Sequence, residues 1–560
     1  MRGRRALALA WAAVLVGGFQ TRSLAASSTK PARDTLRLAV EADPRSLDPV
    51  RAFSNEEGTL SRFVFDTLLE AGVDGQFRPV LAESLPEISS DGLTYTFRLH
   101  PGVRFSNGQP LTSIEVVKSF ERIFNPVHGA LLTVYFKNLL GAAEFESARK
   151  REQQDPGRDA RGKGERWIEP VALAGVESMD PLTFRFRLKQ PDLAFLHVLG
   201  TPAGGIARVD ASWDGKRSPI PLAGTGAYRI RRWVPGAALR FEQNPHSFRT
   251  VSKPFRGIDV LINVHRTTQA MMFERGELDF LYFLADQDFI RFRRNPSLRS
   301  LLRVVRGTTP TYVVMNCEMG PFTNRLVRVA LNHAVDRQGL MKVLSHRGQP
   351  QRGPLPLVVS GFNRGLPEYS YDPVLARRLL AEAGFPNGFA TQLWAPQENP
   401  VWMKSALFVQ QNLREIGVEA RIHSVSFAAL NDSVGRRRTV PLSMYNWVTI
   451  ADDPKETLDC LLNGDNITEQ ACMNTSFYSN LDVQELFRQA DREVNPAQRI
   501  SHYQSIERQV VRDAPWIFLI QLDHEMAVQP WLRGFEFRGF WPPARLEACS
   551  FEGSTEARRP

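Results

Sequence analysis

The sequence predicts an α/β protein of two lobes, with crossing strands between them and a ligand cleft where they meet. Three observations point to this fold class. The chain has 560 residues, which is too long for one hydrophobic core, so two or three domains are expected. Strand patterns predominate before about residue 266, and strands alternate with helices from there to about residue 520. A last strand pattern follows, and its return to the first lobe would complete two lobes around a cleft.

The N-terminal part is expected to hold short strands separated by turns. Residues 36–40 alternate apolar and polar side chains, and a helical face follows at residues 56–69. Thr112 and Glu115 have the spacing of a capping box, in which the Thr112 hydroxyl accepts a hydrogen bond from the Glu115 backbone, so a helix is expected to start there. The other strands predicted in this part are residues 94–99, 180–188, 228–230, 238–242 and 258–264.

Two further features mark this first part. Residues 180–188 (DPLTFRFRL) echo residues 91–99 (DGLTYTFRL), which indicates two similar strands in one lobe rather than a tandem repeat. Residues 146–166 are rich in charge and nearly free of large apolar side chains, so we expect an exposed insertion, with a partner-docking loop as the alternative.

The later part alternates helices with strands. Residues 401–416 have an amphipathic pattern that Gly417 ends, and Asp372 precedes a helix with Pro373 at its first position. The other helices expected here are residues 323–335, 336–344, 481–490 and 496–511, and the expected strands are residues 418–423, 442–448 and 516–522.

Residues 1–25 have the pattern of a secretory signal. Arginines precede an apolar stretch, residues 7–19, that is shorter than the roughly 20 residues of a membrane-spanning helix. Small residues at positions 23 and 25 predict cleavage after Ala25, and a twin-arginine signal is the alternative. The mature protein is expected to be soluble and without a lipid anchor, and losing four arginines lowers its net charge from +10 to +6.

Several function classes are not supported by the sequence. It has no basic stretch interleaved with aromatic residues and no zinc-finger spacing, so nucleic acid is not an expected partner. It also lacks a G-x-S-x-G motif, and His524-Glu525 has no second histidine of a zinc-protease motif. Asp452 and Asp453 are adjacent, so on a strand their carboxylates would face opposite ways. We therefore expect no enzyme activity, no cofactor and no metal.

Six segments in chain order carry a resemblance to a known family. They are residues 36–49 (LRLAVEADPRSLDP), 89–117 (SSDGLTYTFRLHPGVRFSNGQPLTSIEVV), 224–245 (GTGAYRIRRWVPGAALRFEQNP), 274–279 (ERGELD), 322–340 (FTNRLVRVALNHAVDRQGL) and 371–388 (YDPVLARRLLAEAGFPNG). Together they resemble the extracellular solute-binding proteins, family 5, of the dipeptide and oligopeptide import systems.

The resemblance implies a bilobal periplasmic-binding-protein fold of the large peptide-binder type, whose hinge-linked lobes close over the ligand. It implies three domains: a split domain I (34–52, 183–265 and 521–556), an inserted domain II (53–182) and a domain III that forms the opposite lobe (266–520). The implied function is the periplasmic solute-binding component of an ABC importer, a monomer that captures a peptide or another small elongated solute and docks on an inner-membrane permease. A sensor or chaperone-like periplasmic protein without a transport role is the alternative.

The chain contains four cysteines: Cys317, Cys460, Cys472 and Cys549. An even number in an exported chain indicates disulfides. Cys460 and Cys472 are close enough in sequence to close a short loop, and the resemblance supports this pair because the family often has a bridge after its tryptophan motif. The state of Cys317 and Cys549 is left open.

In the family, the segment that follows a Leu-Asp-Pro motif runs along the bound ligand. Here this segment is Phe53, Ser54 and Asn55, whose backbone groups are expected to pair with an extended ligand as an added strand; an ordinary surface loop is the alternative. Tyr312 is a further candidate for the cleft, with core packing as its alternative.

The most informative candidate site is residues 445–454, YNWVTIADDP. Its candidate ligand contacts are Tyr445, Asn446, Trp447, Thr449, Ile450, Asp452 and Asp453. Peptide binders of the family that the chain resembles have an aspartate three residues after the tryptophan, which holds the peptide α-ammonium by a charge-assisted hydrogen bond. In this sequence that position is Ile450, whereas Asp453-Pro454 matches the acidic residue and proline that follow.

A buried ammonium without a carboxylate is costly. The sequence therefore predicts that a free peptide N-terminus is not held in the family's usual way. The alternative is that Asp452 shifts inward as a substitute, but strand alternation places it on the face of Ile450 only if no bulge intervenes. An N-blocked peptide, an opine-like or sugar-like compound, or another elongated solute would fit. The nearby arginines at 436–438 are expected to form a solvated loop, with a basic rim for anionic ligands as the alternative.

Overall fold

Four strands that are distant in sequence form one sheet. Its order is β1 (Thr35–Ala39), β12 (Gly257–Leu261), β11 (Ala238–Gln243) and β10 (Tyr228–Val234). β1 runs parallel to β12, and the remaining neighbours are antiparallel. Because side chains alternate along a strand, one face of this sheet is apolar and buries Leu36, Leu38, Ile258 and Val260.

The two segments of similar sequence pair with each other. β5 (Thr94–Arg98) and β7 (Thr183–Arg187) are antiparallel neighbours in a sheet that also contains β4 (Glu87–Ile88) and β6 (Val176–Ser178). The rings of Phe97 and Phe184 stack with centroids 5.5 Å apart. The echo in sequence arises because both strands give aromatic side chains to one core. β7 thus belongs to the sheet of the predicted inserted domain; the domain boundaries themselves stay a prediction.

Helix α2 (Ser113–Phe124) starts where the sequence predicts, but without the predicted capping box. The Thr112 side chain makes no capping hydrogen bond. The Glu115 carboxylate instead binds the Arg208 guanidinium at 2.6 Å, because a charged donor outcompetes the helix N-terminus for it.

Helix α3 (Ala142–Gln154) contains the first residues of the predicted exposed insertion, whose part at residues 155–166 lies outside the described residues. Phe145 is buried and anchors the helix to the core of this region. Ion pairs between Arg149 and Glu152 and between Lys150 and Glu146 follow the helical spacing, which explains why a charge-rich segment is helical here.

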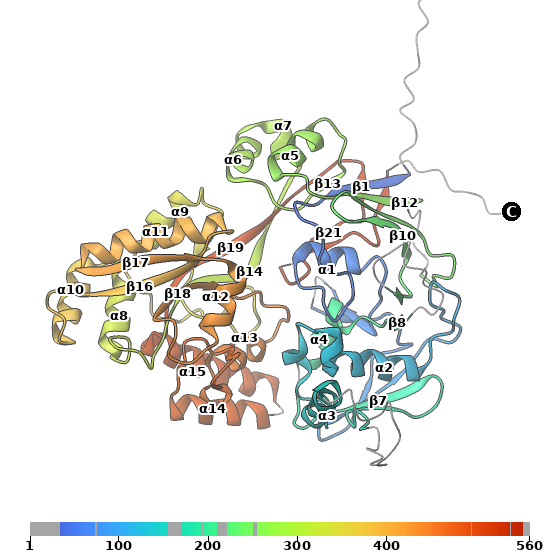
Figure 1. The fold of residues 1–560 in the computed structure, drawn as a ribbon, viewed down its shortest axis with the longest axis horizontal. Helices are drawn as coiled ribbons and strands as arrows, with labels where there is room; N and C mark the ends of the chain where they lie inside the picture. The colour runs from blue at the N-terminus through green and yellow to red at the C-terminus, as the bar shows by residue number, and fades with distance from the viewer. Residues whose placement is uncertain are drawn as a thin grey trace, which may run out of the picture. The chain divides into compact units, whose positions relative to one another are not determined.

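Seven strands form the largest sheet, and two of them are long. The order is β13 (Phe280–Leu281), β19 (Trp516–Val528), β14 (Leu302–Met315), β18 (Leu442–Asn446), β16 (Phe389–Pro396) and β17 (Val418–Val425), with β15 (Gly348–Pro350) paired to β19. β14 and β19 run antiparallel, from the neighbourhood of β13 and β1 to that of β16–β18 (Figure 1). They are the crossing strands that the sequence analysis expected.

Helices cover this sheet. Helices α8 (Arg325–Ala334), α10 (Pro373–Glu382) and α11 (Pro400–Glu415) share an apolar core with its strands. A second core contains α13 (Pro454–Leu462), α14 (Leu481–Arg492) and α15 (Pro496–Asp513), which lie together in Figure 1.

A buried cluster of charges ties the end of the chain to its beginning. The Glu547 carboxylate accepts hydrogen bonds from Arg62 Nε at 2.8 Å and Arg545 Nε at 3.1 Å, and both guanidiniums also contact Glu70. Burial alone would raise the pKa of Glu547, but Arg62 and Arg545 hold this pKa far below its usual range.

This computed structural model describes residues 34–552, apart from 73–74, 155–170, 193, 210–220, 250–254, 494 and 538. The predicted secretory signal, residues 1–25, lies outside them. Of the helices within these ranges, none combines the length and apolar character required to traverse a lipid bilayer.

Candidate ligand-binding site

The turn after β18 leads directly into α13, and Asp453 fixes the start of that helix. Its carboxylate accepts a hydrogen bond from the Lys455 backbone at 2.9 Å, and Pro454 occupies the first helical position. Both carboxylate oxygens also bind the Arg499 guanidinium, at 2.7 and 2.9 Å, with both side chains buried. Asp453 is therefore fully engaged as a helix cap and ion-pair partner.

Asp452 and Ile450, the two other positions considered for the ammonium contact, are also held by contacts within the protein. Asp452 accepts hydrogen bonds from the Ser360 backbone at 2.6 Å and from its hydroxyl at 2.9 Å, so it does not turn inward to replace the missing aspartate. Ile450 is 7% exposed and packs with Trp541 and Val50 in an apolar cluster. Where the family's peptide binders have a carboxylate, this chain has a buried apolar contact.

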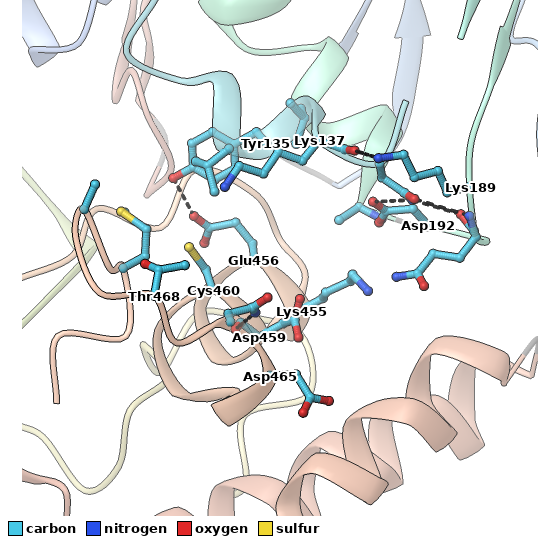
Figure 2. Close-up of a pocket in the computed structure, with 18 of the residues that line it drawn as sticks. Tyr135, Lys137, Lys189, Asp192, Lys455, Glu456, Asp459, Cys460, Asp465 and Thr468 are labelled. Carbon is cyan, nitrogen blue, oxygen red and sulfur yellow. Dashed lines mark hydrogen bonds between the residues drawn. The ribbon is translucent and has the colours of Figure 1, made fainter. Parts of the chain in front are cut away.

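Glu456 in the first turn of α13 collects hydrogen bonds from two distant parts of the chain. Its Oε1 accepts from Trp447 Nε1 at 3.0 Å and from the Tyr135 hydroxyl at 2.9 Å, and its Oε2 accepts from the Thr457 hydroxyl at 3.0 Å. Figure 2 shows Tyr135 and Glu456 pointing toward each other. Burial raises the pKa of Glu456 to about 7, although these donors oppose the shift.

The remaining residues of the predicted motif lie around this contact. Thr449 is fully buried, and its hydroxyl is 2.9 Å from that of Thr457. Tyr445 and Asn446 are half-buried at the end of β18, and the Tyr445 hydroxyl donates to Asn431. Tyr312 faces Tyr445 across the strands but has no exposed surface, because its ring stacks on Trp516 with centroids 3.8 Å apart. The burial of Tyr312 favours core packing, which was the alternative for this residue in the sequence analysis.

Phe53, Ser54 and Asn55 lie at the start of α1 (Asn55–Ser61). Ser54 and Glu57 form a capping box, and the Glu57 carboxylate accepts hydrogen bonds from the backbone of Phe53 at 2.9 Å and of Ser54 at 3.1 Å. The Ser54 carbonyl accepts from Trp541 Nε1 at 3.2 Å. The amides of Phe53 and Ser54 and the carbonyl of Ser54 are thus occupied within the protein, and pairing of this segment with an extended ligand stays a prediction. The Ser-x-x-Glu spacing at 54–57 was the available signal for this helix start.

A cavity of about 660 Å³ adjoins Glu456 and has two walls (Figure 2). One wall is made of Val134, Tyr135, Lys137, Asn138, Lys189, Gln190, Asp192, Ala194 and Val198. The other is made of Lys455, Glu456, Asp459, Cys460, Asp465, Asn466, Thr468, Gln470, Ala471 and Met473. Contacts between the walls lie beside it, from Tyr135 to Glu456 and from Gln190 to Asp491 at 3.3 Å.

None of the site residues predicted from the ligand motif lines this cavity directly. Trp447 reaches it only through the shared hydrogen bond to Glu456, and its ring centroid lies 6.4 Å from that of Tyr135. The sequence contains no signal that would join residues 134–138 to residues 455–473, since tertiary packing alone brings the two segments together.

The predicted disulfide between Cys460 and Cys472 is not present. All four cysteines are free. Cys460 lines the cavity, whereas Cys472 is buried with its Sγ 3.4 Å from the carbonyl oxygen of Asn474. The loop between them is held in place by another interaction, because Arg437 binds both Glu318 and Glu469 at 2.6 Å. Arg436 and Arg438 have exposed side chains, as expected of a solvated loop, and the ion pairs of Arg437 do not favour the basic rim that was its alternative.

We expect the stability of the protein to depend on the charge of Glu456. The folded protein binds a proton at Glu456 up to about pH 7, whereas the unfolded chain releases it near pH 4.5. The neutral carboxyl group of Glu456 therefore contributes stability that is fully present below pH 4.5 and is lost as the pH rises through 7. From pH 5 to 8, the free energy of unfolding should therefore fall by about 1–3 kcal/mol more in the wild type than in Glu456→Gln, as measured by urea unfolding.

Tyr135→Phe is the matched control for this prediction. It removes a hydrogen bond that favours the charged carboxylate of Glu456 but keeps the titrating group. The pH dependence of the free energy of unfolding should therefore remain and shift to higher pH. Parallel stability curves for the wild type and Glu456→Gln would contradict the prediction.

Comparison with known proteins adds independent information. A sequence model described as "Bacterial extracellular solute-binding proteins, family 5 Middle" matches residues 76–469. A protein of Pectobacterium atrosepticum, "Glutathione-binding protein GsiB", is 29% identical over 511 residues, which cover 90% of this chain and 92% of that protein. The protein of the same name from Escherichia coli K12 is 26% identical over 504 residues, covering 89% and 91% of the two chains.

Solved structures show the same fold. The "Clavulanic acid biosynthesis oligopeptide binding protein 2" superposes with a TM-score of 0.80 and 24% identity, over 92% of this chain and 95% of that one. The periplasmic binding protein DppA from Helicobacter pylori, in complex with the peptide STSA, gives a TM-score of 0.73 and 23% identity over 92% and 98% of the two chains. The bilobal binding-protein fold predicted from the sequence is thereby confirmed.

Proposed function

This chain belongs to the bacterial extracellular solute-binding proteins, family 5, and on that premise we propose that its solute is a short peptide or peptide-like compound bound in the cavity beside Glu456. Proteins of this family bind solutes for ABC importers and are not enzymes, so the chain is the solute-binding component of such an importer. The observation that carries the choice of solute is the cavity itself, whose two walls present both charge signs and hydrogen-bonding groups.

Glutathione is the first ligand to consider. Two relatives that align over about nine-tenths of the chain are named for binding it, and it is a peptide-like compound of three residues. A volume of about 660 Å³ lies within the range of cavities that enclose ligands of this size.

We further propose how the protein is exported, where it is located and which partner it docks on. The leader pattern supports export, cleavage after Ala25 and a periplasmic protein without a lipid anchor, and the family supports docking of a monomer on an inner-membrane permease. Three domains with closing lobes remain the proposed organisation.

Native mass spectrometry of the exported protein, followed by isothermal titration calorimetry, tests the proposal. We expect a bound peptide-like solute at one copy per chain, and binding of reduced glutathione or trialanine to the emptied protein. Thr468→Trp fills part of the cavity and should weaken this binding at least about 10-fold, because the added ring takes the volume of the ligand.

Leu481→Trp is the matched control. Leu481 is 78% exposed on α14 and is not part of the cavity wall, so binding should be unchanged. Exclusive binding of a sugar, or equal effects of the two tryptophan substitutions, would overturn the proposal.

A further inference from the structure

The charged side chains around the cavity are unevenly divided between its walls. The first wall has Lys137, Lys189 and Asp192, and the second has Lys455, Glu456, Asp459 and Asp465. Lysines therefore predominate on one wall and carboxylates on the other. Oppositely charged walls favour a ligand that itself carries separated charges of both signs.

At one end of the cavity, three carboxylates share a single lysine. Lys455 forms an ion pair with Asp491 and also interacts electrostatically with Asp192 and Asp459. Burial alone would lower the pKa of Lys455, but these three carboxylates raise it. The charge of Arg499 also acts on Asp192, but its guanidinium is ion-paired with Asp453, so carboxylates still outnumber cations at this end.

Neither Asp192 nor Asp459 has a cation of the described chain within ion-pair distance. Asp459 accepts a hydrogen bond from Asn463 at 2.7 Å, and Asp192 accepts from the Ala194 backbone at 3.1 Å and from Asn138 at 3.4 Å. Burial raises the pKa of both carboxyl groups even though Lys455 opposes the shift. A cation from the ligand would relieve this cost.

Lys137 supplies the opposite sign. It is exposed to the cavity and, among the residues that the structure describes, its ammonium makes neither a hydrogen bond nor an ion pair. Figure 2 shows its side chain on the side of the cavity near Tyr135. Burial raises the pKa of the Cys460 thiol on the other wall, and the charge of Lys137 opposes this rise. Lys189, by contrast, donates to the Lys137 carbonyl at 3.0 Å.

We propose that this cavity selects dipolar ligands: a free ammonium group sits between Asp192 and Asp459, beside Lys455, and a carboxylate at the other end of the ligand is held by Lys137. The inference rests on the proposed function and names the groups that give it specificity. The ammonium site lies on α13, nine residues beyond position 450, so a free amino terminus is accepted here without the aspartate that Ile450 replaces.

The arrangement also links recognition to the contact between the walls. Asp192 and Lys137 come from the first wall and Asp459 from the second, so one ammonium bridges both walls. A ligand that lacks the ammonium would leave the buried carboxylates of Asp192 and Asp459, one on each wall, without this added cation.

The test combines charge-removing variants with charge-blocked ligands. Reduced glutathione and trialanine are each used in free form, N-acetylated, and with the C-terminal carboxylate blocked as an ester or amide. By calorimetry, Asp459→Asn should weaken binding of the free form by about 10- to 100-fold and leave the already weaker N-acetylated form nearly unchanged. Lys137→Gln should weaken the free form similarly and leave the carboxylate-blocked form nearly unchanged.

Two variants control for general charge effects. Asp432→Asn and Lys150→Gln remove exposed charges outside the cavity and should not alter affinity. The melting temperature of each variant shows whether it is folded. If Asp459→Asn does not fold, Asp192→Asn removes a carboxylate from the other wall instead.

The outcomes separate this inference from the proposed function. If the free probes bind and the cavity variants bind them equally well, or if N-acetylated probes bind as tightly as free ones, the inference is overturned while the proposed function stands. If no form of either probe binds the wild-type protein, the proposed function is overturned and the inference with it.

Discussion

Replacing Asp453 with asparagine is expected to lower the free energy of unfolding by about 3–5 kcal/mol, because the Arg499 guanidinium would then be buried without a counter-ion. The asparagine can still cap α13, so the loss reports the ion pair rather than the helix start. Urea unfolding of the wild type and the variant measures the difference. Binding of free and N-acetylated ligands should weaken equally, since Asp453 contacts the protein and not the ligand.

Two further variants sharpen this test. Asp432→Asn breaks an exposed ion pair with Arg436 and should cost less than about 1 kcal/mol. Adding Arg499→Met to Asp453→Asn should recover part of the lost stability, because no unpaired charge remains buried. A loss below about 1 kcal/mol for Asp453→Asn, or a loss of affinity limited to ligands with a free amino terminus, would contradict our view of Asp453.

Replacing Glu547 with glutamine should destabilise the protein by a similar amount, about 3–5 kcal/mol. Arg62 and Arg545 would be left with Glu70 as their nearest carboxylate in a buried cluster. Since the pKa of Glu547 is depressed in the folded protein, its stabilising contribution is fully present above its unfolded value of about 4.5. It is lost progressively as the pH falls from there toward the depressed folded pKa. The difference between wild type and variant should therefore shrink in acid.

Glu552→Gln is the control for this second prediction. Its partner Arg533 is 56% exposed, and removing this surface pair should change stability by less than about 1 kcal/mol. Thermal unfolding at pH 7 and at pH 4 measures both variants. A difference between wild type and Glu547→Gln that does not depend on pH would show that packing, not charge, holds the end of the chain in place.

The fold could be predicted because its signals are local or belong to recognisable segments. Residues 94–99 and 183–187 alternate apolar and polar side chains because every second side chain faces the core. This pattern can be recognised before the partner strand is known. The start of α10 at Asp372-Pro373 was likewise visible, since a cap needs only its neighbours in sequence. The same Asp-Pro signal precedes α13 at Asp453-Pro454, although no helix was predicted there.

The candidate site was harder to predict because its chemistry depends on distant partners. The motif around Trp447 lies next to the cavity through Glu456, yet Asp452 and Asp453 are occupied by Ser360 and Arg499, which lie 92 and 46 residues away. The capping box expected at Thr112 failed for the same reason, because Arg208 competes for Glu115. The cavity residues Lys137 and Asp192 belong to no motif at all, and only packing brings them opposite α13.

The position of β19 has a consequence for how the polypeptide matures. This strand is the last long one to be synthesised, yet it lies inside the sheet, hydrogen-bonded to β13, β14 and β15. Until residues 516–528 have been made, β14 lacks a neighbour that begins some 200 residues later in the chain. A nascent or truncated chain that stops before β19 would expose the edges of β13 and β14. Such a chain would be a substrate for chaperones and proteases rather than a partly folded binding protein.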